Sequence, residues 1–313
     1  MAGNTSASLS LLERTNVWSA ELKEILRDEL QGMKYVNWLD QFPDGDTFKI
    51  PSIGDATLND YTEDSAVTYD ALDASEFTFQ ITEYIQSGNY LTRKAEQDLY
   101  YSNQVLSQFV PLQERALMER LESDIMGLQS GQTAGNANAI NGAAHRMIGS
   151  GASNAIGVAD FAKALHSLKT AKVPQRNLVA IVDPSVEFEL NTLSQITSVS
   201  NNPRWEGIVN SGIATGMSFV ANIYGFDVYT SNYLADIASE TIGSTTATNA
   251  KANLFFSADQ GVLPFVGAWR QMPTVDMEFN KDYQRTEFVT TARYGVKLYR
   301  PENLVTVLTE PTI

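Results

Sequence analysis

The stretch from Ile50 to Thr92 limits the possible folds more than any other part of the chain, because it contains no lysine or arginine. Apolar and polar residues alternate at both of its ends, at 47–50 and at 77–82, as in β-strands. The residues between them are polar and acidic, with too few apolar side chains to form a core. This pattern predicts a long β-hairpin over about 46–85, closed by Gly88. Such a hairpin needs contacts with other chains, because an isolated two-stranded hairpin is only marginally stable in water.

The acidic side chains of this hairpin allow three interpretations. One is a calcium site, although the ligand spacing of an EF-hand is absent. The second is a solvated acidic arm, and the third, which we favour, is an arm that lies on a basic strip of a neighbouring copy. The candidate contact residues are acidic or apolar on the hairpin and basic on the helix that follows: Asp55, Asp60, Glu63, Asp64, Asp70, Phe77, Phe79, Ile81, Arg93, Lys94, Arg115 and Arg120. Without neighbours, the apolar strand face at 77–81 would be exposed.

Apolar residues at helical spacing predict helices at 11–33, 91–128 and 158–168. Pro111 should kink or divide the second of these. A further helix should follow the Asp183-Pro184 pair, because aspartate caps helix N-termini and proline suits the first helical position.

Strand patterns fill much of the rest of the chain. They predict strands at 178–182, 219–230, 254–256 and 304–308, and a second long hairpin over 275–298 with its turn near 281–284. Small and polar residues predict a linker at 129–157 and an exposed, flexible loop at 238–250. The mixture of helices, hairpins and buried strands predicts an α+β fold.

Composition excludes several classes of protein. The chain has no cysteine, so it has neither a disulfide framework nor a thiolate zinc site. Its net charge of −15 argues against nucleic acid as a direct partner, because binding phosphates requires basic patches, and against an anionic membrane surface. No signal-peptide core is expected at the start. Asn and Gly residues interrupt the long uncharged stretch 207–226, which favours buried sheet and loop over a membrane span.

Motifs for catalysis are also missing. The sequence has no phosphate-binding P-loop, no dinucleotide fingerprint and no G-x-S-x-G nucleophile elbow. The only histidines are His145, expected in a Gly/Ala loop, and His166, expected on a polar helix face. We therefore predict no enzyme activity and no catalytic, cofactor-binding or metal-binding residue. A β-rich carbohydrate-binding or hydrolytic protein that uses paired carboxylates remains a rival from another class.

Three stretches resemble a known family. The sequence D-G-D-T-F-K-I-P-S-I-G-D-A-T from Asp44, with the later F-T-F-Q-I-T-E, is similar to the extended loop of phage coats. The segment I-Y-G-F-D-V-Y-T-S-N-Y-L within 211–234 is similar to a segment of their axial domain. A third segment resembles the strand that closes their peripheral domain: T-A-R-Y-G-V-K-L-Y-R-P-E-N-L-V within 291–305. Because the three motifs occur in this order along the chain, it resembles major capsid proteins of tailed phages with the Hong Kong 97-type fold.

The resemblance implies a division of the chain. Residues 1–42 would form an N-terminal arm and 43–91 an extended loop, or E-loop. A peripheral domain would combine the spine helix at 92–130 with the hairpin at 266–302. An axial domain would contain 131–265 and 303–313.

The resemblance also implies a structural role in the virion. Copies would assemble into hexamers and pentamers of an icosahedral head around double-stranded DNA, without sequence-specific binding to it. Assembly would take place in the host cytoplasm with a separate scaffolding protein, a portal and in some cases a decoration protein, and would involve no membrane. An encapsulin-type compartment shell, which shares the fold but encloses protein cargo, is the nearest alternative.

Overall fold

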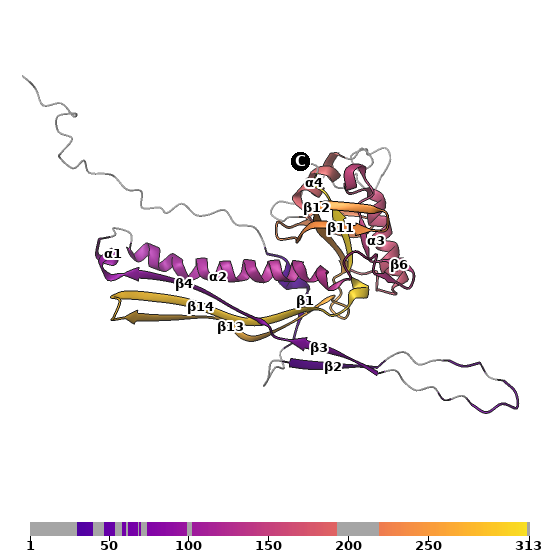
Figure 1. The fold of residues 1–313 in the computed structure, drawn as a ribbon, viewed down its shortest axis with the longest axis horizontal. Helices are drawn as coiled ribbons and strands as arrows, with labels where there is room; N and C mark the ends of the chain where they lie inside the picture. The colour runs from indigo at the N-terminus through magenta and orange to yellow at the C-terminus, as the bar shows by residue number, and fades with distance from the viewer. Residues whose placement is uncertain are drawn as a thin grey trace, which may run out of the picture.

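A computed structural model describes residues 30–39, 47–53, 58–60, 62–67, 69, 74–98, 102–192 and 219–311. Figure 1 shows a body of strands and helices from which two elongated elements extend in opposite directions. One is a long helix lying along a sheet, and the other is a separate two-stranded hairpin. No described helix is long and apolar enough to cross a membrane.

The first elongated element is a four-stranded sheet in the order β1-β13-β14-β4. Its strands are β1 (Val36–Trp38), β13 (Phe265–Asn280), β14 (Arg285–Leu298) and β4 (Glu83–Thr92). The predicted hairpin at 275–298 and its turn are confirmed, because β13 and β14 pair antiparallel from Phe265↔Leu298 to Asn280↔Arg285.

One face of this sheet is covered by α2 (Ser102–Gly127), which follows the short α1 (Arg93–Asp98). The predicted division of the long helix at Pro111 is wrong, because α2 continues through the proline. Contacts with the sheet hold the helix on this course: Gln113 donates a hydrogen bond to the Phe288 carbonyl, and the Tyr294 hydroxyl donates one to Asp124.

The second elongated element is the hairpin of β2 (Thr47–Ile53) and β3 (Ala74–Gln80), which pair with Phe48 opposite Phe79. The predicted hairpin is confirmed, but its expected length is wrong. Gly88 does not close it, since this residue lies within β4 opposite Val289 of β14. Residues 83–92 pair with β14 in the four-stranded sheet, where Leu91 is buried and Ile85 packs against the core that includes Leu121 of α2.

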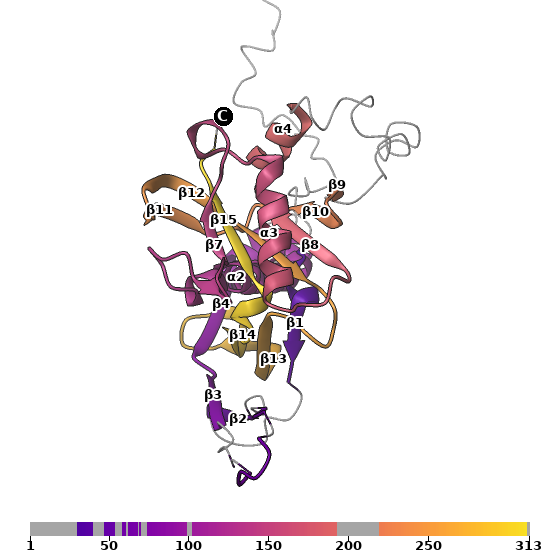
Figure 2. The same cartoon turned by 90° about the vertical axis from the view of Figure 1, so that its right-hand side faces the viewer.

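The body is built on a seven-stranded sheet in the order β7-β15-β12-β8-β10-β9, with β11 paired to β12. These strands are β7 (Arg146–Ile148), β15 (Val305–Thr309), β12 (Thr245–Ser257), β8 (Leu178–Val182), β10 (Phe226–Thr230), β9 (Phe219–Ile223) and β11 (Asp236–Ile242). A short pair, β5 (Ala139–Ile140) and β6 (Ala143–Ala144), precedes them. Figure 2 shows α3 (Val158–Thr170) lying across this sheet.

Two apolar cores flank the seven-stranded sheet. Under α3, the rings of Phe161, Phe226 and Phe255 contact one another edge to face. The other core joins the sheet to α2 through Phe256 and Leu121. The helix α4 (Pro184–Thr192) begins as predicted, because the Asp183 carboxylate accepts hydrogen bonds from the backbone N–H and the hydroxyl of Ser185.

The prediction of a flexible loop at 238–250 is wrong. These residues belong to β11 and β12, which pair across a turn at Gly243, whose φ is +63°. Ala247 and Ala250 are fully buried and pack in a small core with Leu308, so the small residues of this segment contribute to a core. The predicted helix at 11–33 falls largely outside the described residues, and at its end Gly32–Tyr35 form a 3₁₀ turn. The 211–218 part of the second family motif also lies outside the described residues.

Candidate interface surfaces

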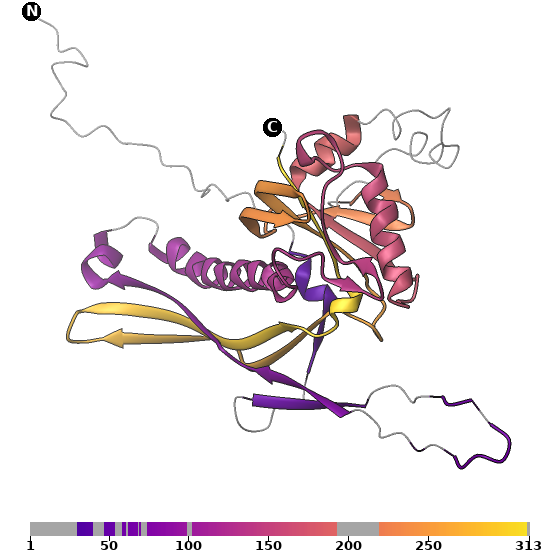
Figure 3. The same cartoon turned by 45° about the vertical axis from the view of Figure 1, so that its right-hand side comes forward.

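At the tip of the β2–β3 hairpin, between the two strands, every described side chain is exposed to solvent. Asp60, Glu63 and Asp64 are exposed, as is Leu58, whose side chain is 96% accessible. Figure 3 shows this tip far from the body. Asp55 and Asp70, two further candidates, lie outside the described residues. An exposed leucine beside three carboxylates is a surface that a contact with another chain could cover.

The base of the hairpin is a core of the chain itself. Phe79 and Ile81 are 0% and 3% accessible and pack with Val266 and Ala268. The expectation that this face is exposed without neighbours is therefore wrong for both residues. Sequence alternation could not reveal that the chain itself covers this face with β13.

Phe77, on the same strand face, is half-buried. Its ring contacts Tyr299 edge to face at 4.9 Å, and the Lys297 ammonium lies 5.1 Å from the ring centroid. Phe77 thus retains an accessible part that Phe79 and Ile81 do not have.

The predicted basic strip divides into two parts. On α2, Arg115 pairs with Glu119 at 2.7 Å and Arg120 pairs with Asp124 at 3.1 Å, so each arginine has an acidic partner on its own helix. At the far end of the sheet, Arg93 lies over the Phe279 ring and Lys94 is exposed.

Sequence reasoning missed an apolar edge on β13. Within the described residues, β13 pairs with β1 only over 265–267, which leaves the edge at 268–280 without a partner strand. Its side chains include Met272 and Met277, which are 67% and 69% accessible. The alternation at 275–279 was visible in the sequence, but nothing there revealed that the strand lies at an edge. Long edges with exposed apolar residues are sites where another chain can pair or pack.

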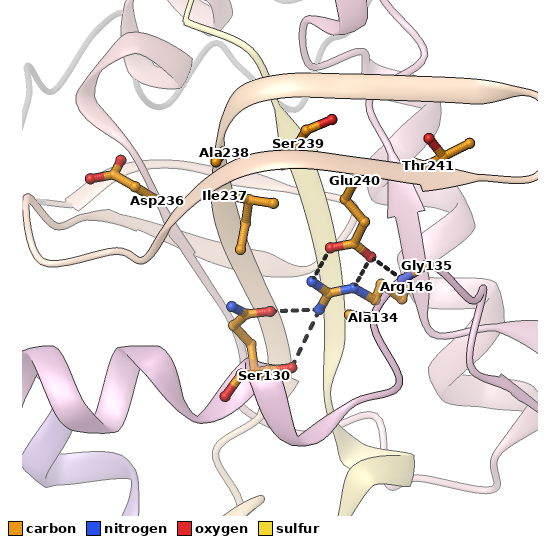
Figure 4. Close-up of a pocket in the computed structure, with 11 residues that line it drawn as sticks. Ser130, Ala134, Gly135, Arg146, Asp236, Ile237, Ala238, Ser239, Glu240 and Thr241 are labelled. Atoms are coloured by element: carbon orange, nitrogen blue, oxygen red, sulfur yellow. Dashed lines mark hydrogen bonds and ion pairs between the residues drawn. The ribbon is translucent and has the colours of Figure 1, made fainter.

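A buried ion pair fixes the junction between α2 and the body. Arg146 is 1% accessible and donates two hydrogen bonds of 2.6 Å to the Glu240 carboxylate, and its guanidinium also contacts Gln129 (Figure 4). The Arg146 hydrogen bonds lower the pKa of Glu240. These residues border a pocket of about 550 Å³ under β11, but Glu240 and Gln129 of the chain itself hold the guanidinium, so we assign the group a structural role.

A buried carboxylate holds the segment before β1. Glu122 on α2 is 0% accessible and accepts backbone hydrogen bonds from Gln31 at 3.0 Å and from Gly32 at 2.8 Å. Burial raises the pKa of this carboxyl, and the backbone donors oppose the shift. Gly32 is needed here, because a Cβ at this position would lie 2.9 Å from a Glu122 carboxylate oxygen.

The remaining titratable groups form no reactive cluster that the structure describes. His145 lies in the bend between β6 and β7, in a loop as predicted, but it is buried, and burial lowers its pKa. His166 is exposed on α3 as predicted. Among the described residues, no group of three or more His, Asp or Glu side chains could hold a metal ion.

Comparison with known proteins identifies the architecture. A family model described as phage capsid protein matches residues 75–307. No curated protein matches the sequence. Solved structures match over nearly the whole chain. At their low sequence identity this structural match shows the fold alone, which is the Hong Kong 97-type α+β capsid fold that the sequence predicted.

Three of these structures illustrate the likeness. A structure from Mycobacterium phage Che8 is 17% identical, with a TM-score of 0.69, and the match covers 94% of this chain and 96% of that one. The capsid of Cyanophage P-SCSP1u is 15% identical, with a TM-score of 0.74 and coverage of 99% and 96%. The capsid of Ralstonia phage GP4 is 11% identical, with a TM-score of 0.68 and coverage of 99% of each chain.

Proposed function

The chain belongs to the phage capsid protein family, and from this membership we propose that its copies form the hexamers and pentamers of an icosahedral head that encloses double-stranded DNA. The role is structural and not enzymatic. Neither an encapsulin-type compartment nor a carbohydrate-active protein is favoured by the family match.

The observation that carries this proposal is the pair of elongated elements. The β2–β3 tip and the free edge of β13 lie at opposite ends of the molecule, and both expose large apolar side chains, Leu58 and Met277 among them. Surfaces that differ and point in opposite directions make head-to-tail contacts, which close into rings when the rotation permits. Rings of five and six are the units of an icosahedral shell.

We assign the acidic tip to a contact with a neighbouring copy. Arg93 and Lys94 are its best basic partners, because no carboxylate of the described residues forms an ion pair with either of them. Arg115 and Arg120 can join only by exchanging partners with Glu119 and Asp124 on the same helix. Each such surface pair contributes about 0–1 kcal/mol and is screened by salt, so their effect depends on repetition around the shell.

The division into domains is part of the same proposal. The arm would be 1–42, the E-loop 43–91, the peripheral domain 92–130 with 266–302, and the axial domain 131–265 with 303–313. The pairing of β4 with β14 favours moving the end of the E-loop to about residue 82. A separate scaffolding protein, a portal and in some cases a decoration protein would complete the head, with assembly in the host cytoplasm.

Negative-stain microscopy of the purified full-length chain, expressed alone and with a candidate scaffolding protein, tests the function. We expect closed shells or capsomer rings. Monomers under both conditions, at concentrations well above micromolar, would contradict the proposal.

A further inference from the structure

The segment of sequence that contains α3 differs in charge from the rest of this acidic chain. Between Ile125 and Val182 the only acidic residue is Asp160, whose side chain is fully buried. Exposed cationic or titratable side chains gather at the end of α3 and in the turn after it, and we call them the α3 basic turn: His166, Lys169, Lys172 and Arg176. This is the reverse of the acidic hairpin tip.

The side chains of the α3 basic turn have no acidic partner. None of the four forms an ion pair with a carboxylate in the part of the chain that the structure describes. Some cations elsewhere do pair, such as Lys163 with Asp160 and Lys251 with Asp236, whereas Arg93 and Lys94 at the far end of the sheet do not pair among the described residues. The charge of the turn is therefore available to an external anion.

The backbone of the turn is firmly held. Lys172, at a φ of +61°, donates its N–H to the Lys169 carbonyl at 3.0 Å. The Ser257 hydroxyl donates to the Arg176 carbonyl at 2.7 Å, and the Ala258 N–H donates to the Asn177 carbonyl at 2.8 Å. These bonds attach the turn to the end of β12, so the bases of its side chains have fixed positions.

The surroundings of the turn distinguish a phosphate from a protein surface as its partner. None of the exposed large apolar side chains of the described chain lies between 125 and 182, although Tyr224, 54% accessible, lies at the same edge of the sheet just before β10. A tyrosine hydroxyl can also donate to a phosphate. Protein interfaces depend on aromatic or aliphatic anchors, whereas phosphate contacts need only cations and neutral donors. Exposed neutral donors are present, with Gln175 in the turn and Asn141 beside it, where its amide donates to the Thr170 carbonyl.

We propose that the α3 basic turn contacts phosphates of the enclosed DNA, and that this end of α3 faces the interior of the head. The inference rests on the proposed function and adds its contact with the genome. Contacts to the DNA backbone carry no sequence information. The net charge of −15 does not prevent them, because charges more than about 10 Å away are largely screened at about 0.1 M salt.

The test measures the binding of the full-length, unassembled chain to a random-sequence DNA duplex by fluorescence anisotropy at several salt concentrations. Each phosphate contact adds about 0.9 to the slope of log K against log salt. The triple variant Lys169→Gln/Lys172→Gln/Arg176→Gln should therefore lower the magnitude of the slope by about 2–3. The matched control, Arg93→Gln/Lys94→Gln/Lys281→Gln, removes the same charge from the far end of the sheet and should leave the slope unchanged.

Shell formation by wild type and by the α3 variant separates this inference from the proposed function. The α3 variant should fold, as judged by circular dichroism, and should still form shells. Equal slopes in both variants, no DNA binding by wild type at low salt, or a folded α3 variant that forms no shells would each overturn the DNA contact. Failure of the wild-type chain to form any shell would instead overturn the proposed function.

Discussion

Replacing Glu122 by alanine should weaken the attachment of the segment at 30–35 to α2. The substitution leaves the N–H groups of Gln31 and Gly32 without their carboxylate acceptor, in a place where Gln31 is 3% accessible. A buried donor without a partner costs about 1–3 kcal/mol. Two such donors cost about 2–6 kcal/mol, and relief from burying a charge offsets part of this. We expect a net loss of about 2–4 kcal/mol.

The assay is thermal and denaturant unfolding of the unassembled chain. In a chain of this length, each kcal/mol corresponds to about 1.5 °C of Tm, so the loss predicts a decrease of about 3–6 °C. Glu114→Ala, at an exposed position of the same helix, is the control and should stay within about 0.5 kcal/mol of wild type. If Glu122→Ala were no more destabilising than Glu114→Ala, the hydrogen bonds would not hold this segment, and the reasoning would be refuted.

The dependence on pH gives an independent check of the same carboxyl. Burial raises the pKa of Glu122, while Lys34 and Arg115 act in the opposite direction. When the folded state raises a group's pKa, the contribution of that group to the free energy of unfolding is fully present below the pKa of the unfolded state. It is lost as the pH rises through the pKa of the folded state. The stability of wild type relative to Glu122→Gln should therefore increase from pH 7 to pH 5. A constant difference would contradict the burial argument.

Four further outcomes are expected. Glu63→Lys/Asp64→Lys should slow assembly in light scattering, and added salt should restore part of it; normal assembly would favour a solvated arm. Heads boiled in SDS should run on a gel as one band near 34.4 kDa, because 53–74 contains no lysine for a covalent cross-link between subunits and Lys49 pairs with Glu76. A ladder of subunit multimers would refute this. A short turn in place of 54–73 should leave circular dichroism unchanged and abolish closed shells; intact shells would show that the tip is dispensable. Burial lowers the pKa of His145, so its contribution to the free energy of unfolding is complete above about pH 6.5 and declines below it. The denaturant midpoint of wild type should therefore fall more between pH 7 and pH 5.5 than that of His145→Gln. Equal losses would contradict this.

Local patterns predicted the elements whose cause is local. The β13–β14 hairpin follows from alternation and a polar turn, α3 from its apolar periodicity, and the start of α4 from Asp183. Each of these signals lies within a few residues of the structure it specifies, and the resemblance to phage coats supplied their arrangement.

Distant pairings could not be predicted in the same way. The strand at 83–92 was assigned to the first hairpin because its partner, β14, lies about two hundred residues later in the chain. The residues at 238–250 looked like a flexible loop because small residues suit both loops and tight cores. Glu122 and Arg146 carry no sequence signal for their roles, since their partners are brought to them only by the fold.

The most direct test of the central claim is a cryo-electron microscopy reconstruction of particles purified from cells that express this chain. We predict icosahedral shells with pentamers at the vertices, in which each subunit shows α2 along the β13–β14 sheet and a hairpin reaching an adjacent copy. Particles without this subunit in their wall, or a chain that stays monomeric while heads form from another protein, would contradict the account.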